Sequence, residues 1–349
     1  MTLQPLKGFQ ALETHHCVTG SMRHIYEFHG YPVSEDVLLG LGAGVGFVYW
    51  HMKGTAPFFG GRANTGRPSE EGLEKTAGRR TGVRIESYCT GSARKAEKAV
   101  LDLLIAGEPV MVQLDMGLLP YFNFPKEYHF GGHAVALAGY DPETRQVLVA
   151  DRDGEPHPVS IEVLARARGS QFNPFPPRNK WYTFDFDHKR QPSPKEVKQA
   201  IREVTTGMLR PPIANLGVKG IRTAAERILK WTKIMSEDNL RYACMNVFIF
   251  IDAKGGSGGG IFRYMYGRFL KEAANIISDE ELARVGEEMH AIGDRWQQVA
   301  QIFERTYSAT SPSTVLPEAS PLILNIADRE QAAWEQLRDI VAGSGSRKT

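Results

Sequence analysis

The spacing of apolar residues predicts that the first half of the chain mixes helices with strands. Between residues 17 and 28 the apolar positions recur at helical spacing, which is typical of a helix with one buried face. Gly30 ends this pattern, and Ser34 stands where its side chain can cap a second helix. We expect further helices over residues 69–78, inside a region 55–82 that otherwise reads as loops, and over residues 93–106.

Short apolar runs after the helix over residues 93–106 predict a sheet. Residues 134–140 and 146–150 are two strand-length runs, and the turn sequence Asp141-Pro-Glu-Thr between them indicates a hairpin. The other expected strands cover residues 110–114, 158–161 and 181–184. The first part of the chain therefore reads as helices followed by a sheet.

The second half is helical almost throughout. We place a domain boundary near residue 190, where a stretch rich in proline and aromatic residues ends. The expected helices cover residues 194–208, 219–236, 238–251, 260–277, 279–306 and 327–342. The pattern predicts an α+β chain with one domain over residues 1–190, a mainly α-helical accessory domain over residues 191–342 and a disordered tail over residues 343–349.

The composition excludes several classes of function. The chain has 349 residues, and 42 basic against 40 acidic side chains give a net charge of +2. This balance, without a block of like charges, argues against binding to nucleic acid or to a membrane surface. No apolar run approaches the roughly 18 residues of a membrane helix. The first residues also lack the apolar core of a signal peptide, so we expect a cytoplasmic protein.

Cys17 is the residue that points to chemistry. The three cysteines, at positions 17, 89 and 244, match no metal-ligand spacing and cannot all pair as disulfides, so we expect no metal site. Cys17 lies at the start of the first predicted helix. Unpaired backbone N–H groups and the positive end of the helix dipole favour a thiolate there. A thiolate is the form in which cysteine acts as a nucleophile.

His133 and Asp151 complete a candidate triad with Cys17. In a hairpin the start of one strand lies beside the end of the next, so the predicted strands bring His133 close to Asp151. Taken singly, Cys17 fits a buried small hydrophobe and His133 fits a core histidine. Asp151 alone fits a turn residue, with Asp153 as the acid that matters. The order Cys, His, Asp on these elements favours a catalytic centre.

A glycine-rich segment in the helical half is a second candidate site. Residues 255–260 lack the Gly-Lys-Ser/Thr ending of a phosphate-binding loop, because Lys254 precedes the glycines. Two readings remain open. The N–H groups of Gly258, Gly259 and Gly260, with Arg263 one turn further on, bind a phosphate or a carboxylate of a substrate, or the segment is a flexible connector between helices.

Longer motifs carry a family resemblance. The segment His16-Cys17-Val-Thr-Gly-Ser21-Met-Arg23 and the segment Gly132-His133-Ala-Val-Ala-Leu-Ala-Gly139 are similar to the N-terminal domain of the butirosin biosynthesis protein H family. In the second half, Lys254-Gly-Gly-Ser-Gly-Gly-Gly260-Ile-Phe262-Arg263 resembles the helical domain that usually accompanies it. The resemblance covers most of residues 13–340.

The resemblance implies an acyltransferase on a papain-like cysteine peptidase/acyltransferase fold. Such an enzyme moves an aminoacyl group from the phosphopantetheine thioester of an acyl carrier protein to a small-molecule amine acceptor in antibiotic biosynthesis. Carried over, Cys17 would hold the acyl group, His133 would deprotonate the thiol and then the amine, and Asp151 would orient His133. The phosphopantetheine enters with the donor, so no further cofactor is expected, and a homo-oligomer is compatible with the sequence.

One departure from the related bacteriocin leader peptidases bears on the reaction. Those enzymes carry an oxyanion-hole glutamine a few residues before the cysteine, where this chain has Ala11-Leu-Glu-Thr-His-His. The candidates for the missing donor are the backbone N–H of Cys17 with the side chain of His16 or Gln113. Two alternatives to the acyltransferase remain: a cysteine peptidase or amidase that uses the same triad, and a non-catalytic binding protein on this fold.

Overall fold

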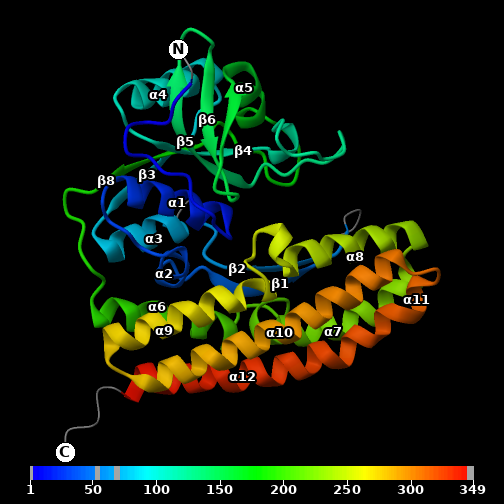
Figure 1. The fold of residues 1–349 in the computed structure, drawn as a ribbon. Helices are drawn as coiled ribbons and strands as arrows, with labels where there is room; N and C mark the ends of the chain where they lie inside the picture. Colours follow the sequence, from blue (N-terminus) through cyan, green and yellow to red (C-terminus); the bar gives the residue numbers. More distant parts are fainter. Residues whose placement is uncertain (1–2, 52–55, 67–70, 344–349) are drawn as a thin grey trace, which may run out of the picture. The chain divides into compact units, whose positions relative to one another are not determined.

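The chain forms two compact units that interleave along the sequence. The structure, a computed structural model, describes residues 3–51, 56–66 and 71–343. The first unit comprises residues 1–38 and 81–191, and the second comprises residues 39–80 and 192–349. A single boundary near residue 190 does not describe this division, because residues 39–80 belong with the helical second half. Figure 1 shows the helices and strands of both units.

A six-stranded antiparallel sheet forms the centre of the first unit. Its strand order is β3–β8–β4–β5–β6–β7. Five of these strands overlap the predicted ones, whereas β3 was not predicted. The strands are β3 (Arg84–Tyr88), β4 (Val110–Leu114), β5 (His133–Asp141), β6 (Gln146–Ala150), β7 (Pro156–Ser160) and β8 (Trp181–Asp185).

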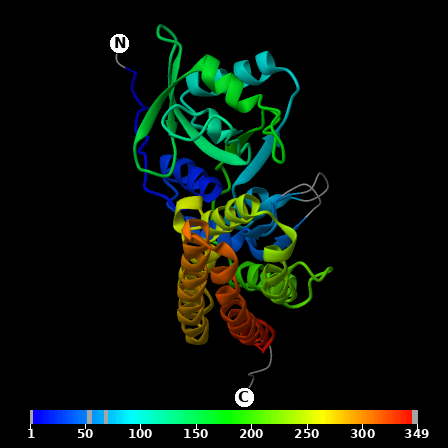
Figure 2. The ribbon, with the colours of Figure 1, turned by 90° about the vertical axis from the view of Figure 1, so that its right-hand side faces the viewer.

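Helices cover both faces of this sheet. Val135 and Leu137 of β5 pack into a core with residues of α4 (Ala93–Ile105) and α5 (Ile161–Arg168). Figure 2 shows α4, in cyan, beside α5, in green. The intervening residues of β5, which point to the opposite face, join a smaller core against which Phe28 of α1 (Cys17–Phe28) packs. The strands and α1 thereby place the start of β5 and the start of α1 in one unit.

The second unit combines a bundle of helices with a two-stranded antiparallel sheet. Figure 1 shows α9, α10 and α12 side by side, and α10 contacts both α9 and α12. Its main elements are α2 (Glu35–Leu41, which begins in the first unit), β1 (Val45–Trp50), β2 (Phe58–Arg62), α3 (Gly72–Thr81), α6 (Pro194–Leu209), α7 (Gly217–Ile234), α8 (Glu237–Ile251), α9 (Arg263–Ile277), α10 (Glu280–Ser308), α11 (Pro312–Val315) and α12 (Ala319–Gly343). Gly343, the first residue of the expected tail, ends α12, and residues 344–349 lie outside the described residues.

Aromatic packing explains why β1 and β2 belong to the helical unit. Phe59 of β2 is fully buried, and its ring packs against Trp231 of α7 and Phe303 of α10. The indole of Trp231 donates a hydrogen bond of 3.2 Å to the hydroxyl of Tyr49 in β1. Gly61 is also required here, because a Cβ at this position would come within 2.7 Å of Ile261 and Phe262. Residues 39–80 therefore complete the core of the helical unit.

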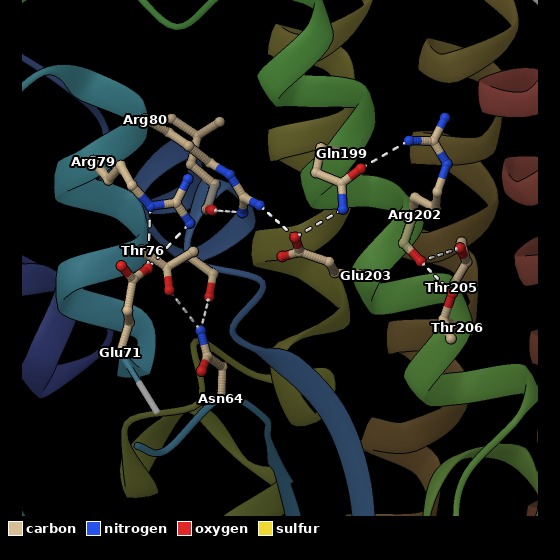
Figure 3. Close-up of polar contacts among 12 residues, drawn as sticks. Asn64, Glu71, Thr76, Arg79, Arg80, Gln199, Arg202, Glu203, Thr205 and Thr206 are labelled. Atoms are coloured by element: carbon tan, nitrogen blue, oxygen red, sulfur yellow. Dashed lines mark hydrogen bonds and ion pairs between the residues drawn. The ribbon is translucent and has the colours of Figure 1, made fainter. Parts of the chain in front are cut away.

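A polar network fixes α3 to α6 in the same unit (Figure 3). The guanidinium of Arg80 is almost fully buried and donates to Glu203 at 2.7 Å and to the carbonyl of Leu41. Gln199 donates a second hydrogen bond to the same oxygen of Glu203 at 3.0 Å. Breaking such a pair from one side leaves an uncompensated buried charge, so the network favours one docking geometry for α3.

Candidate active site

Cys17 occupies the first position of α1. His16 precedes it in an extended conformation and caps the helix: its Nδ1 accepts from the backbone N–H of Thr19 at 3.3 Å and lies 3.0 Å from the Thr19 hydroxyl. At this position the backbone N–H of Cys17 has no carbonyl partner within the helix. The sulfur therefore lies at the positive end of the α1 dipole, and the side chain of Cys17 is half-buried.

A carboxylate anchors the segment just before Cys17. The backbone N–H groups of His15 and His16 donate to the two oxygens of Glu35, at 2.8 Å and 3.1 Å. Glu35 is buried, and burial raises the pKa of its carboxyl even though these two hydrogen bonds act in the opposite direction. Glu35 therefore fixes the turn that delivers Cys17 to the start of α1.

His133 and Asp151 form a buried ion pair. Nε2 of His133 lies 2.7 Å from Oδ2 of Asp151, and both side chains are 3% exposed. The register of β5 and β6 explains the contact. Ala136 of β5 lies opposite Ala150 of β6. Because side chains alternate between the two faces of a sheet, Asp151, the residue after Ala150, lies on the same face as His133. The contact that the hairpin spacing predicts is present. Asp153, the alternative acid, instead lies 2.8 Å from His157 and is more than half exposed.

The surroundings of Cys17 favour its thiolate form. Burial by itself would raise the pKa of the Cys17 thiol. Hydrogen bonding to His133 and to His16, together with the charges of the two rings, outweighs burial and holds the pKa well below its usual range. Nε2 of His133 is engaged by Asp151, so Nδ1 is the ring nitrogen that remains for the sulfur.

Asp151 raises the pKa of the His133 imidazole. Burial tends to lower the pKa of His133, but the charge of Asp151 and its hydrogen bond, with a smaller contribution from Cys17, raise that pKa to about 9. Burial would likewise raise the pKa of Asp151, yet His133, Tyr121 and Arg152 together hold it below its usual range. The arrangement therefore favours the thiolate of Cys17, the imidazolium of His133 and the carboxylate of Asp151.

Among the oxyanion candidates, His16 lies at the sulfur and Gln113 is engaged elsewhere. His16 is one of the two side chains that hydrogen-bond Cys17. Gln113 of β4 donates its amide N–H to the carbonyl of Gly131 at 2.9 Å, which holds the glycine pair before His133. This contact gives Gln113 a role in shaping the turn that leads into β5.

In the second candidate site, the glycine-rich segment with Arg263, the guanidinium is already paired within the fold. Arg263 is fully buried, and its guanidinium donates two hydrogen bonds to Glu330, at 2.9 Å and 2.8 Å. Its remaining donor group binds the carbonyls of Gly46 and Ile261. The prediction that Arg263 binds a substrate anion is therefore wrong, because the charge is neutralised inside the helical unit.

The glycines beside Arg263 are likewise used within the fold. The N–H of Gly259 donates to the hydroxyl of Ser257 at 3.2 Å, and that of Gly260 donates to Gln297 at 3.0 Å. Gly258, Gly259 and Gly260 all have positive φ angles, which glycine adopts at little cost. The segment connects α8 to α9, as the alternative reading has it, but it is an ordered connector and not a flexible one.

The surroundings of the other two cysteines differ from those of Cys17. Cys89 is exposed, and Cys244 is buried with its pKa raised to about 12 by burial. Across residues 3–51, 56–66 and 71–343, no group of three or more histidine, cysteine and acidic side chains is arranged to hold a metal ion. No helix in the same part of the chain is long and apolar enough to cross a membrane.

Two family matches together cover most of the chain. Residues 16–152 match the family described as butirosin biosynthesis protein H, N-terminal, and this range holds Cys17, His133 and Asp151. Residues 162–337 match a domain of unknown function, DUF4872. The chain therefore joins an N-terminal domain of the butirosin biosynthesis protein H family to a DUF4872 domain. Comparison with curated proteins gave no match. Family membership associates this mixed helix–strand chain, with its helical C-terminal region, with antibiotic biosynthesis.

Two further side chains of this family member escaped the sequence analysis. Glu35 directly follows the capping residue Ser34, and Tyr121 lies in an aromatic segment before His133, and neither position is part of a recognisable motif. Tyr121 donates its hydroxyl to Oδ2 of Asp151 at 2.8 Å. Neither contact has a signature in residue spacing, because each joins segments of irregular length that only the tertiary fold brings together.

Proposed function

We propose that this chain is a cysteine-dependent acyltransferase on a papain-like fold, which forms an amide from an acyl carrier protein thioester through an acyl-enzyme at Cys17. The observation that carries the proposal is the position of Cys17 at the start of α1 beside His133, whose Nε2 lies 2.7 Å from Oδ2 of Asp151; this arrangement lowers the pKa of the thiol. A structural thiol in the same chain, Cys244, shows the opposite shift. The family match supports an enzyme of antibiotic biosynthesis, and the resemblance of the sequence motifs implies the transfer reaction and the carrier-protein donor.

In the first half-reaction the Cys17 thiolate attacks the carbonyl carbon of the donor thioester. The carbon–sulfur bond to phosphopantetheine then breaks, and the imidazolium of His133 gives its proton to the departing thiolate. The product is a new thioester between the acyl group and Cys17, with the carrier thiol released. His133 leaves this step neutral and able to act as a base.

In the second half-reaction an amine of the acceptor attacks the Cys17 thioester. Neutral His133 takes a proton from the amine nitrogen, the carbon–sulfur bond breaks, and Cys17 returns to its thiolate form beside the imidazolium. The backbone N–H of Cys17 and the side chain of His16 are the proposed donors to the oxyanion of each tetrahedral intermediate. Phe122, whose ring lies edge-on to His133 at 5.9 Å between centroids, helps to exclude water that would hydrolyse the acyl-enzyme.

Intact-protein mass spectrometry tests the proposal. The full chain is incubated with a panel of acyl-pantetheine thioesters, in parallel with Cys17→Ala and with Cys89→Ser as the matched thiol control. We expect a mass increase of one acyl group in the wild type and in Cys89→Ser, and none in Cys17→Ala. The absence of an adduct with every donor, together with a Cys17 that resists alkylation at pH 6, would instead support a binding protein.

Addition of amines to the loaded enzyme separates transfer from hydrolysis. A transferase releases the acyl group as an amide and loses it slowly to water alone. A peptidase or amidase with the same triad cleaves peptide substrates and discharges the acyl-enzyme to water at a comparable rate whether or not an amine is present.

A further inference from the structure

One oxygen of Asp151 receives two hydrogen bonds. Nε2 of His133 lies 2.7 Å from Oδ2, and the hydroxyl of Tyr121 donates to the same atom at 2.8 Å. The other oxygen, Oδ1, is buried and has no hydrogen-bond partner among the described residues, although Nε of Arg152 lies 3.9 Å from it. Tyr121 therefore shares with His133 the only hydrogen-bonded oxygen of this carboxylate in the described part of the chain.

Tyr121 is itself held through a face of its ring. Its ring stacks on the imidazole of His157 with 4.0 Å between centroids and 14° between planes. His157 lies 2.8 Å from Asp153 through its Nε2. The phenol therefore lies between His157 of the edge strand β7 and the carboxylate of Asp151, and these two contacts limit the positions that its hydroxyl can adopt.

The next residue contacts the other member of the ion pair. The ring of Phe122 packs edge-on against His133 with 5.9 Å between centroids, and it also contacts Tyr121 at 4.8 Å. Two consecutive residues of one loop therefore contact Asp151 and His133. This loop joins β4 to β5, so its position is coupled to both ends of the ion pair.

We propose that Tyr121 is a positioning residue for the acyl-transfer centre, and that its phenol sets both the orientation of Asp151 and the share of the carboxylate charge that reaches His133. The inference rests on the proposed function. The ionisable groups around the pair are Cys17 beside His133, His16 beside Cys17, Arg152 beside Asp151, and the buried His24 of α1, whose charged form Asp151 would favour. Of these neighbours of the carboxylate, Tyr121 is the one that donates to the oxygen bound by His133.

The direction of the effect follows from electrostatics. A phenol O–H draws negative charge away from the oxygen that accepts it, which weakens the attraction of that oxygen for the imidazolium. Removal of the hydroxyl leaves more charge facing His133, so the pKa of His133 should rise. A stronger phenol donor at the same place should lower it.

The experiment measures the rate of Cys17 alkylation by iodoacetamide as a function of pH. The full chain carries Cys89→Ser, so that the exposed thiol of Cys89 does not contribute to the measured alkylation. The upper inflection of this profile follows deprotonation of His133. Tyr121→Phe is compared with Tyr128→Phe, a control on the same loop whose hydroxyl contacts the sulfur of Met116. Incorporation of 3-fluorotyrosine at position 121 preserves the shape and supplies the stronger donor.

We expect the upper inflection to rise by about half a pH unit or more in Tyr121→Phe, to fall with 3-fluorotyrosine, and to stay in place in Tyr128→Phe. In acyl transfer, Tyr121→Phe should lower kcat and leave KM within about twofold, because the residue acts on His133 and does not touch the substrate. Opposite shifts from the two changes at position 121 support the inference even if Tyr121→Phe loses stability.

Two results would count against it in different ways. An unchanged upper inflection with both changes at position 121, while wild-type Cys17 remains reactive at pH 6, overturns the role of Tyr121 and leaves the proposed function intact. A wild-type profile with a single inflection near the usual thiol pKa of about 8.5 rejects the thiolate–imidazolium pair, and with it both the proposed function and this inference.

Discussion

Nε2 of His133 lies 2.7 Å from Oδ2 of Asp151, at the point where the start of β5 meets the end of β6. This contact determines which ring nitrogen serves which neighbour, because it leaves Nδ1 for the sulfur of Cys17. It also brings a negative charge to the side of the ring away from the thiol. The acid–base behaviour of Cys17 therefore depends on a carboxylate that it does not touch, and the following predictions use that dependence.

Removal of the imidazole should return Cys17 towards an ordinary thiol. His133→Ala deletes the leading hydrogen bond that lowers the pKa of Cys17, while burial, which raises it, remains. We expect the alkylation rate at pH 6 to fall at least about tenfold in a Cys89→Ser background, since the pKa moves towards about 8.5. Alkylation that stays fast and selective at pH 6 would sink the triad assignment.

The transfer rate should have an alkaline limit set by His133. Its pKa is raised to about 9, so the imidazolium is present below that pH and is lost as the pH rises through it. The pKa of Cys17 is held well below its usual range, which favours the thiolate on the acidic side of this limit. We therefore expect kcat/KM for a thioester donor to be flat across neutral pH and to decline above about 9. A decline that begins near pH 7 contradicts this account.

Asp151→Asn should slow the reaction and move the alkaline limit downward. The amide can still orient the ring, but it lacks the charge that raises the pKa of His133. We expect a loss in kcat/KM of about tenfold or more with little change in thermal unfolding temperature. Asp153→Asn is the comparison, because Asp153 faces His157. If Asp153→Asn proves the more damaging change, Asp153 is the acid of the triad.

Arg263→Met should destabilise the protein without weakening donor binding. The substitution leaves Glu330 buried and facing the indole N–H groups of Trp296 and Trp334 without its guanidinium partner. Breaking a buried pair from one side costs about 3–5 kcal/mol, whereas an exposed pair such as Arg222–Asp328 contributes about 0–1 kcal/mol.

Chemical unfolding of Arg263→Met, with Arg222→Ala as the exposed control, measures this difference directly. The double variant Arg263→Met with Glu330→Leu should recover part of the loss, because it removes both buried charges. A stable Arg263→Met protein with a raised KM for the donor would restore Arg263 as a substrate-binding residue.

Local sequence patterns predicted the elements that carry the triad. Periodic apolar positions located α1, and strand-length runs around a turn located β5 and β6, which is sufficient to place His133 beside Asp151. These features are local, because each depends on residues within one element or one hairpin. The same reasoning found the positions of α6, α7, α8 and α10 within a few residues.

Features that depend on distant partners escaped prediction. β2 contains Gly60 and Gly61, which are unfavourable in a strand, and the reason for Gly61 is the close approach of Ile261 two hundred residues later in the chain. Arg263 looked available for an anion because nothing nearby in sequence neutralises it, whereas its partner Glu330 lies on α12. A single sequence does not indicate which distant element completes a core or cancels a charge.

The interleaved division of the chain has a consequence for its synthesis. Phe59 leaves the ribosome long before Trp231 and Phe303, the rings that enclose it. At about 5–20 residues per second, the nascent chain carries β1 and β2 without their helical partners for roughly ten seconds or more. The segment that matches the N-terminal domain, residues 16–152, is therefore fully synthesised before the helices that pack against its β1 and β2 exist. Exposed strand edges and aromatic rings during this interval make chaperone binding, rather than sequential domain folding, the expected early event.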